Sequence, residues 1–315
     1  MQLCNITKVF DNSMHNAFTS ITWFRGLPYI AFRCGTAHDS ADGRVLVLRG
    51  DREGRRWLPV AALWAGIDTR DPKLLVAPDG LYVYCFTHRT DTDEVGSGYV
   101  VSHDGDNWGP WTTVQNNWVY WRPEWFGDAA YVAAYHHTPY QSEGPVVLKR
   151  SVDARHWEDV CTLVDDERRQ ANETALSLAP DGRMWAIVRS EHGSELPLLG
   201  WATAPFTDWH FEELSIKLQG PYLWRVGQSL YLSGRWFQPS GLYNTAVFRM
   251  EEGRPVPQLV LPSAGDTSYM GAVPADPEDT SKAGRWWLSY YSAHENLALG
   301  FKNFAAIYLA EVELD

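Results

Sequence analysis

The sequence contains few cysteines, and they follow no recognisable pattern. Cys4, Cys34, Cys85 and Cys161 are widely spaced, and no Cys-x-x-Cys pair occurs. Neither a zinc site nor a disulfide framework is indicated, and we expect no metal and no cofactor. The sequence also lacks a run of about 18 apolar residues, which argues against a membrane-spanning helix.

Positive charge is scarce. Lys and Arg number 27 against 39 Asp and Glu, a formal net charge of −12. This balance argues against nucleic acid or an anionic membrane as the main partner. The first ten residues, MQLCNITKVF, have no basic start followed by an apolar core, so no signal peptide is visible. We expect a cytoplasmic protein; a leader removed ahead of Met1 would make it secreted or periplasmic instead.

Helical periodicity is absent, and a strand pattern of about 50 residues occurs six times instead. The clearest copies are residues 72–86 and 173–188, in which Ala-Pro-Asp-Gly separates two β-patterned runs. A repeat of this length made of strands predicts an all-β, six-bladed β-propeller with four-stranded antiparallel blades, one domain over residues 1–315. The opening strands are expected to begin near Ser20, Pro72, Arg122, Glu173, Pro221 and Tyr269.

The two ends of the chain are both β-patterned, at residues 3–10 and 306–314. Pairing them in one blade would close the ring and remove the open sheet edges. The chain also has turns of the form Ser-x-Asp-x-x-x-Trp, at residues 102–108 and 151–157, with weaker copies at 51–57 and 206–209. Ser and Asp side chains there bond nearby backbone groups, so we assign these turns a structural role.

Polar residues gather at one point of the repeat. In an antiparallel hairpin the start of the first strand and the end of the second lie at the same end, so these positions should line one face around the axis. The strand starts carry Arg70, Asp71, Arg122, Glu124, Asn172, Glu173, Asp266 and Tyr269, and the strand ends carry Arg33, His88, His136, His137, Arg189, Arg235, Tyr291, His294 and Glu295. We predict a functional site at this end.

Two carboxylates occupy equivalent places in blades two and four. Asp71 and Glu173 are 102 residues apart, two repeats, and should face each other across the pocket. Opposed carboxylates suit general acid and base work on a glycosidic bond. The alternative is structural, with Asp71 paired to Arg70 and Glu173 to Arg189.

The chain resembles the sialidase superfamily, Asp-box (BNR-repeat) propellers of six blades that hydrolyse terminal acidic sugars, and it looks like a divergent branch. Glu173 followed by Arg189 resembles the family's Glu that assists the nucleophile and the Arg after it. Residues 220–235 resemble the blade that carries the next Arg, Arg235. Residues 266–269 followed by 287–291 resemble the strand pair that presents the nucleophilic Tyr, here Tyr269. The family's Arg-Ile-Pro near the first strand is absent; residues 18–21 stand there.

The resemblance implies an exo-glycosidase for a terminal sugar with a carboxylate, a sialic acid or a related keto-acid sugar. Arginine forks bind a carboxylate bidentately, and a neutral Tyr avoids the repulsion that a carboxylate nucleophile would meet. Tyr269 is the implied nucleophile, Glu173 its base, and Asp71 or a His38–Asp39 pair the acid. The expected substrate-binding residues are Arg33, Arg70, Arg189, Arg235, Asp266 and His137, with Arg33 or Arg70 replacing the missing triad member.

Two alternative functions and two structural alternatives for single residues stay open. The chain could be a propeller glycosidase or polysaccharide lyase for a uronic acid or neutral sugar, or a propeller that only binds a glycan or peptide. Tyr269 could simply close the pocket floor, and His38 could be a loop histidine bonded to a backbone carbonyl. Three arginines meeting beside Tyr269 would favour the sialidase reading. Separation of Glu173 from Tyr269 would favour the binding reading.

Overall fold

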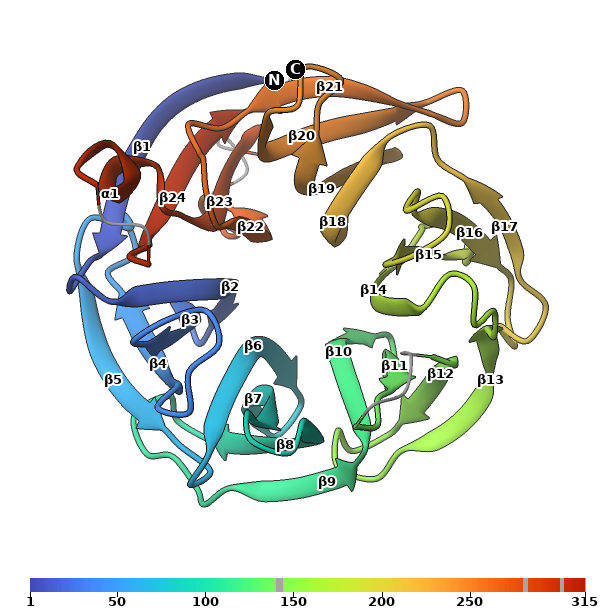
Figure 1. The fold of residues 1–315 in the computed structure, drawn as a ribbon, viewed down its shortest axis with the longest axis horizontal. Coiled ribbons are helices and arrows are strands. Elements are labelled where there is room, and N and C mark those ends of the chain that lie inside the picture. The colour runs from blue at the N-terminus through green and yellow to red at the C-terminus, as the bar shows by residue number, and fades with distance from the viewer. Residues whose placement is uncertain (140–143, 280–282, 301–302, 315) are drawn as a thin grey trace.

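The computed structural model describes residues 1–139, 144–279, 283–300 and 303–314. Six four-stranded antiparallel sheets surround a central axis as the blades of one ring (Figure 1). The predicted six-bladed propeller is confirmed.

The first three blades follow the chain from the inside outward. Blade one contains β2 (His15–Phe24), β3 (Leu27–Gly35), β4 (Arg44–Gly50) and β5 (Trp57–Leu63). Blade two contains β6 (Asp68–Ala77), β7 (Gly80–Arg89), β8 (Glu94–Ser102) and β9 (Thr112–Asn116). Blade three contains β10 (Trp118–Phe126), β11 (Ala129–His136), β12 (Val146–Ser151) and β13 (Glu158–Val164).

The remaining blades complete the ring. Blade four contains β14 (Ala171–Leu178), β15 (Met184–Ser190), β16 (Leu198–Ala202) and β17 (His210–Glu213). Blade five contains β18 (Lys217–Val226), β19 (Ser229–Phe237), β20 (Tyr243–Glu251) and β21 (Arg254–Val260). Blade six contains β22 (Thr267–Pro274), β23 (Arg285–Ser292), β24 (Ala306–Glu313) and, outermost, β1 (Gln2–Phe10).

The ring closes where the two ends of the chain pair. Strand β1 runs antiparallel to β24, from Gln2 opposite Glu313 to Phe10 opposite Ile307, and both termini lie together at the rim (Figure 1). The predicted closure is confirmed. One short helix, α1 (His294–Ala298), follows β23. In the part of the chain that the structure describes, no helix is long and apolar enough to cross a membrane.

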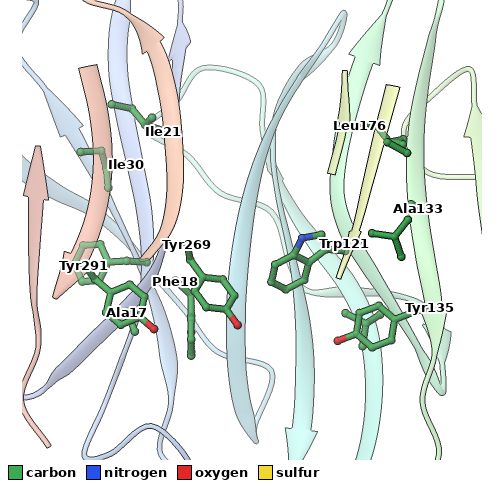
Figure 2. Packing of buried hydrophobic residues seen from close by; sticks show 14 of the residues in the cluster. Ala17, Phe18, Ile21, Ile30, Trp121, Ala133, Tyr135, Leu176, Tyr269 and Tyr291 are labelled. Atoms are coloured by element: carbon green, nitrogen blue, oxygen red, sulfur yellow. The ribbon is translucent and has the colours of Figure 1, made fainter. Parts of the chain in front are cut away.

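Burial falls from the axis outward. The inner strands are buried almost throughout, as in β2 and β6, whereas the outer β9 and β17 are mostly exposed. Inner strands are covered on both faces by neighbouring blades, so apolar residues such as Ala17, Ile21 and Trp121 pack there (Figure 2). The hydrophobic core therefore lies between the blades and surrounds the central axis.

Two outer turns of the Ser-x-Asp-x-x-x-Trp form are held by their aspartates. Asp104 accepts hydrogen bonds from the N–H groups of Asp106 and Asn107 at 2.9 and 2.7 Å. Asp153 accepts from the N–H groups of Arg155 and His156, each at 2.8 Å. The side chain that ends the second turn, Trp157, donates from Nε1 to Tyr84 Oη of blade two at 3.0 Å. This turn therefore ties blade three to blade two.

Every inner strand carries a β-bulge at the same phase. The register breaks lie between Ala17 and Ser20, Arg70 and Lys73, Trp121 and Glu124, Ala171 and Thr174, Gln219 and Tyr222, and Ser268 and Gly271. Five bulges hold a residue in the left-handed region, namely Phe18 (φ 63°), Asp71 (49°), Arg122 (51°), Gly220 (58°) and Tyr269 (48°). In the fourth bulge the corresponding residue is Asn172, and Glu173 follows it, so the predicted equivalence of Asp71 and Glu173 is off by one residue. Because a bulge re-aims a side chain, these six bulges define the candidate site.

Candidate active site

The ring of Tyr269 lies at the centre of the propeller. Its strand, β22, belongs to blade six, yet the ring contacts a residue of each other blade. The ring centroid is 5.0 Å from that of Phe18, 5.6 Å from that of Trp121 and 5.8 Å from Lys73 Nζ. The phenol donates to Glu173, and Gly220 lies against the ring. Figure 2 shows Tyr269 beside Phe18 and facing the side of Trp121.

Glu173 is the partner of Tyr269. Tyr269 Oη donates to Glu173 Oε1 at 2.6 Å, and Arg189 Nη1 lies 2.9 Å from the same oxygen. The N–H of Gly220 donates to the other oxygen, Oε2, at 3.2 Å. Burial raises the pKa of Tyr269 well above its usual value, and the charge of Glu173 adds to this. The phenol is therefore neutral at rest and is already bonded to a base.

Gly220 makes room for this pair. Its φ is positive, and a Cβ at this position would lie 3.1 Å from two carbon atoms of the Tyr269 ring. Any side chain here would press on a ring that Phe18 and Trp121 hold on other sides. Glycine is required both by the backbone and by the close approach.

Asp71 lies among buried cations. Arg70 Nε is 3.4 Å from Asp71 Oδ2, and Lys73 Nζ is 4.0 Å from Asp71 Oδ1. Burial raises the pKa of Asp71, while the charges of Lys73 and Arg70 oppose the rise. Arg70 also reaches Asp39, at 2.9 Å, and lies over the ring of Phe18. A carboxyl held this way can keep its proton at a higher pH than an exposed one.

Arg122 extends the group of cations toward blade five. Its Nη2 donates to the carbonyl of Met270 at 2.9 Å, and the guanidinium lies 4.2 Å from the centroid of the Tyr222 ring. Burial lowers the pKa of Arg122 and raises that of nearby Glu124 to about 7. The contacts of Arg122 across the axis show that it closes the floor between three blades.

Asp266 organises a second polar cluster beside Tyr269. Its Oδ1 accepts from Tyr291 Oη at 2.6 Å and from Arg235 Nη2 at 2.7 Å. Its Oδ2 lies 2.7 Å from His15 Nε2 and 2.5 Å from His38 Nδ1. Burial would raise the pKa of Asp266, but these hydrogen bonds and charges hold it well below its usual value.

This cluster leaves one nitrogen of His38 for a substrate. Both oxygens of Asp266 are occupied, so the carboxylate positions its neighbours. The His38 side chain is 43% exposed, and a cavity of about 470 Å³ is lined by His38, Arg235, Phe237, Tyr243, Gly265 and Asp266. With Nδ1 facing Asp266, Nε2 of His38 is not engaged by that carboxylate.

Among the described residues, His15, His38 and Asp266 form the one group that could hold a metal. One ligand atom each of His15, His38 and Asp266 lies within 4.8 Å of the others. Ligands of a tetrahedral zinc, with Zn–N near 2.0 Å, are about 3.3 Å apart. The separations of 2.7 and 2.5 Å are shorter than this edge and match hydrogen bonds from N–H groups to a carboxylate.

The structure does not bring every predicted residue to the site. Arg33 is fully buried, and its guanidinium is bound to Asp68 and to the backbone of the loop after β3. It cannot reach a substrate, so the prediction for Arg33 is wrong. The expected His38–Asp39 pair does not form, because Asp39 pairs with Arg70 and His38 with Asp266.

His137 is another residue that the sequence predicted to bind the substrate. His137 Nε2 lies 3.4 Å from Asp93, in the loop after β7, and its role in binding stays a prediction. Lys73, Phe18, Gly220 and His15 were not predicted as site residues. The bulge phase, which Phe18 and Gly220 share with Tyr269, could have indicated those two. No local sequence pattern indicates that Lys73 or His15 belongs to the site.

Comparison with known proteins places the fold. No protein-family model and no curated protein matches the chain. A protein of unknown function from Dyadobacter fermentans is 16% identical, with a TM-score of 0.79 over 100% of this chain and 99% of that chain. An α-L-arabinanase from Penicillium chrysogenum, complexed with arabinobiose, is 12% identical, with a TM-score of 0.75 over 99% of each chain.

A sialidase from Trypanosoma rangeli, in complex with the inhibitor DANA, is 12% identical, with a TM-score of 0.65 over 94% of this chain and 55% of that chain. At these identities the similarity concerns the fold alone. The chain is a β-propeller, and the structures similar to it include glycoside hydrolases of more than one kind.

Proposed function

We propose that the chain is a retaining exo-glycosidase of the sialidase type, which removes a terminal sugar bearing a carboxylate, a sialic acid or a related keto-acid sugar. The observation that carries the proposal is the 2.6 Å hydrogen bond between Tyr269 and Glu173 at the axis. A propeller that only binds glycans was expected to separate these residues. The turns of blades two and three are Asp-boxes in this proposal.

The first step forms a bond between Tyr269 and the sugar. Tyr269 Oη attacks the anomeric carbon while its proton passes to Glu173 Oε1. The bond from this carbon to the leaving oxygen breaks, and Asp71 gives that oxygen a proton. Arg189 Nη1 lies 2.9 Å from Glu173 Oε1, the oxygen that accepts this proton.

The second step releases the sugar. Water attacks the anomeric carbon and loses a proton to Asp71, while the Tyr269 oxygen leaves and recovers its proton from Glu173. His38 is the alternative acid, since its Nδ1 faces Asp266 and its Nε2 is left for the substrate.

Two arginines support recognition of an anion. Arg189 and Arg235 are both close enough to lower the pKa of Tyr269, although burial outweighs them. Arg70 lies behind the ring of Phe18, 5.0 Å from its centroid. A carboxylate on the anomeric carbon would face Arg189 and Arg235, while Arg70 would act through Asp71.

The test is hydrolysis of fluorogenic glycosides by the wild type, by Tyr269→Phe and by the control Tyr290→Phe. Tyr290 is also buried on an inner hairpin, but its hydroxyl bonds the carbonyl of Pro262. We expect release from the sialoside, a loss of at least about 100-fold in Tyr269→Phe because no nucleophile remains, and no loss in Tyr290→Phe. A fluorinated sialosyl fluoride should label Tyr269. Sialoside activity that survives in Tyr269→Phe would refute the mechanism.

A second candidate is a glycosidase for a neutral sugar or a uronic acid, with Asp71 and Glu173 as the reacting pair. The observation that favours it is that each of these arginines already pairs with a carboxylate of the protein. The pairs are Arg70 with Asp39 and Asp71, Arg189 with Glu173, and Arg235 with Asp266. The panel therefore includes an α-L-arabinofuranoside and a glucuronide. Release from one of these alone would select this candidate, and binding without any release would select the non-catalytic one.

A further inference from the structure

A buried lysine lies against the floor of the proposed site. Lys73 is in β6, two residues after Asp71, and is 1% exposed. Its Nζ lies 4.2 Å from the centroid of the Trp121 ring and 5.8 Å from that of the Tyr269 ring. Asp71 Oδ1 is 4.0 Å away, beyond hydrogen-bond distance.

A buried lysine in this arrangement is expected to destabilise the protein core. Among the described residues, neither Lys73 Nζ nor Asp71 Oδ1 has a hydrogen-bond partner. Burying a charge without hydrogen bonds destabilises a fold, and a methionine of similar length would fill the same space. Such unsatisfied groups in a native core call for a cause. Here one of the two groups belongs to the proposed acid, Asp71, and the other, Lys73 Nζ, lies 5.8 Å from the ring centroid of the proposed nucleophile.

We propose that Lys73 is a positioning residue for Asp71, whose carboxylate it stabilises as that carboxylate forms during the first step. The inference rests on the proposed function. In that step the tyrosine proton goes to Glu173 and the Asp71 proton goes to the leaving oxygen. Negative charge therefore moves from Glu173 to Asp71, where Lys73 already stands. A charge arranged in advance at the place where charge develops is a strong source of catalysis.

The pH dependence follows from the groups that face Lys73. These are Asp71 on β6, Cys85 on β7, Arg122 on β10, Glu173 on β14 and Tyr269 on β22. Burial lowers the pKa of Lys73 to about 7, against the pull of Asp71 and Glu173. Burial also raises the pKa of Asp71, and Lys73 opposes that rise. Removing Lys73 therefore raises the pKa of Asp71 further.

The experiment compares Lys73→Met with Lys149→Met. Lys149 is also buried over aromatic rings, 4.6 Å from the centroid of the Trp118 ring, but pairs with Asp159 in blade three. In Lys73→Met we expect kcat to fall roughly 100-fold with little change in KM. An acid works only while protonated, so activity falls as pH rises through the pKa of Asp71. That alkaline limb should move to higher pH in Lys73→Met and stay in place in Lys149→Met.

Lys73→Arg serves as the conservative rescue and should restore the position of the alkaline limb in part. A Lys73→Met enzyme with the kcat and pH profile of the wild type would overturn the proposal. So would equal loss in both Met variants, which is the result for a merely structural lysine. Thermal melts run in parallel identify a variant that fails to fold, and Lys73→Arg then carries the test.

A measurement without turnover separates this proposal from the proposed function. In protein carrying ¹³C-lysine, Lys73 is assigned by the signal that Lys73→Met lacks, and its pKa should be about 7, below the usual value of a lysine. In Asp71→Asn its pKa should fall further, because the opposing carboxylate is gone. An unchanged Lys73 titration in Asp71→Asn would overturn the coupling, whatever the glycosides show. If the wild type hydrolyses no glycoside, the proposed function fails by itself.

Discussion

The residues at the axis are held in a backbone conformation that costs energy. Phe18, Asp71, Arg122 and Tyr269 all have positive φ, a region that costs L-residues about 1–2 kcal/mol each. Such outliers persist where the surroundings hold them, and they gather at functional sites. Here the inner bulges turn chemically different side chains, an aromatic ring, a carboxylate, a guanidinium and a phenol, toward one point.

Gly220 offers a test of this arrangement. Gly220→Ala adds backbone strain and also a methyl group 3.1 Å from the Tyr269 ring, whereas Gly227→Ala adds similar strain with no atom within 4 Å. Both variants should lose about 1–2 kcal/mol of unfolding free energy. Only Gly220→Ala should also lose activity, by at least about 10-fold, because the ring moves off Glu173. Equal activity in the two variants would show that the contact with Tyr269 does not matter.

At the scale of the element, the sequence located the blades but not their bulges. The predicted opening strands begin two to five residues too late, as at Ser20 against His15 and at Tyr269 against Thr267. The bulge interrupts the alternation on which strand prediction depends, so the sequence pattern indicates only the regular part of each strand. The positions of Glu173, Arg189 and Tyr269 within their hairpins still predicted correctly that these three residues lie together. Arg33 shares that phase, but its partner Asp68 lies in the next blade.

The outer turns can be tested separately from the site. Burial would raise the pKa of Asp153, but hydrogen bonds from His156, Arg155 and Ser151 hold it well below its usual value. Its stabilising effect is therefore full above the unfolded pKa of about 3.9 and is lost as pH falls through the lower folded value. Asp153→Ala should cost about 1 kcal/mol at pH 7, since the side chain is partly exposed.

The measurement for this turn is chemical denaturation at pH 7 and near pH 3. The deficit of Asp153→Ala should shrink at the lower pH, activity should stay unchanged, and Glu158→Ala on the exposed next strand should resemble the wild type. A deficit as large near pH 3 as at pH 7 would mean that the charge of Asp153 is not what holds the turn.

At the scale of the whole molecule, the site exists only when the ring is closed. Tyr269 of blade six receives one contact from each other blade, and these contacts come from residues up to 251 positions away along the chain. A local sequence pattern indicates which residues face the axis, but it does not indicate which of these side chains contact one another. That is why Lys73 and His15 could not be found before the blades were placed.

Closure by β1 should therefore support both stability and the site. Deleting residues 1–10 exposes the edge of β24 and removes the contacts that Leu3, Ile6, Val9 and Phe10 make with the core. At about 1 kcal/mol for each partly buried side chain, we expect Tm to fall on the order of 10 °C. The exposed edge should also promote association, seen by light scattering.

A relocated strand is the control for that deletion. Gln2 lies opposite Glu313, so residues 1–10 placed after Asp315 through a short turn can reach the same position on β24. This permuted chain should recover the Tm of the wild type and should lose the association seen in the deleted chain, because the strand pairing is the same and only the connection differs. If the relocated strand restores nothing, the N-terminal residues act through their covalent link to β2 and not through closure. If the deleted chain melts like the wild type, blade six is stable with three strands, and the axial site does not depend on β1.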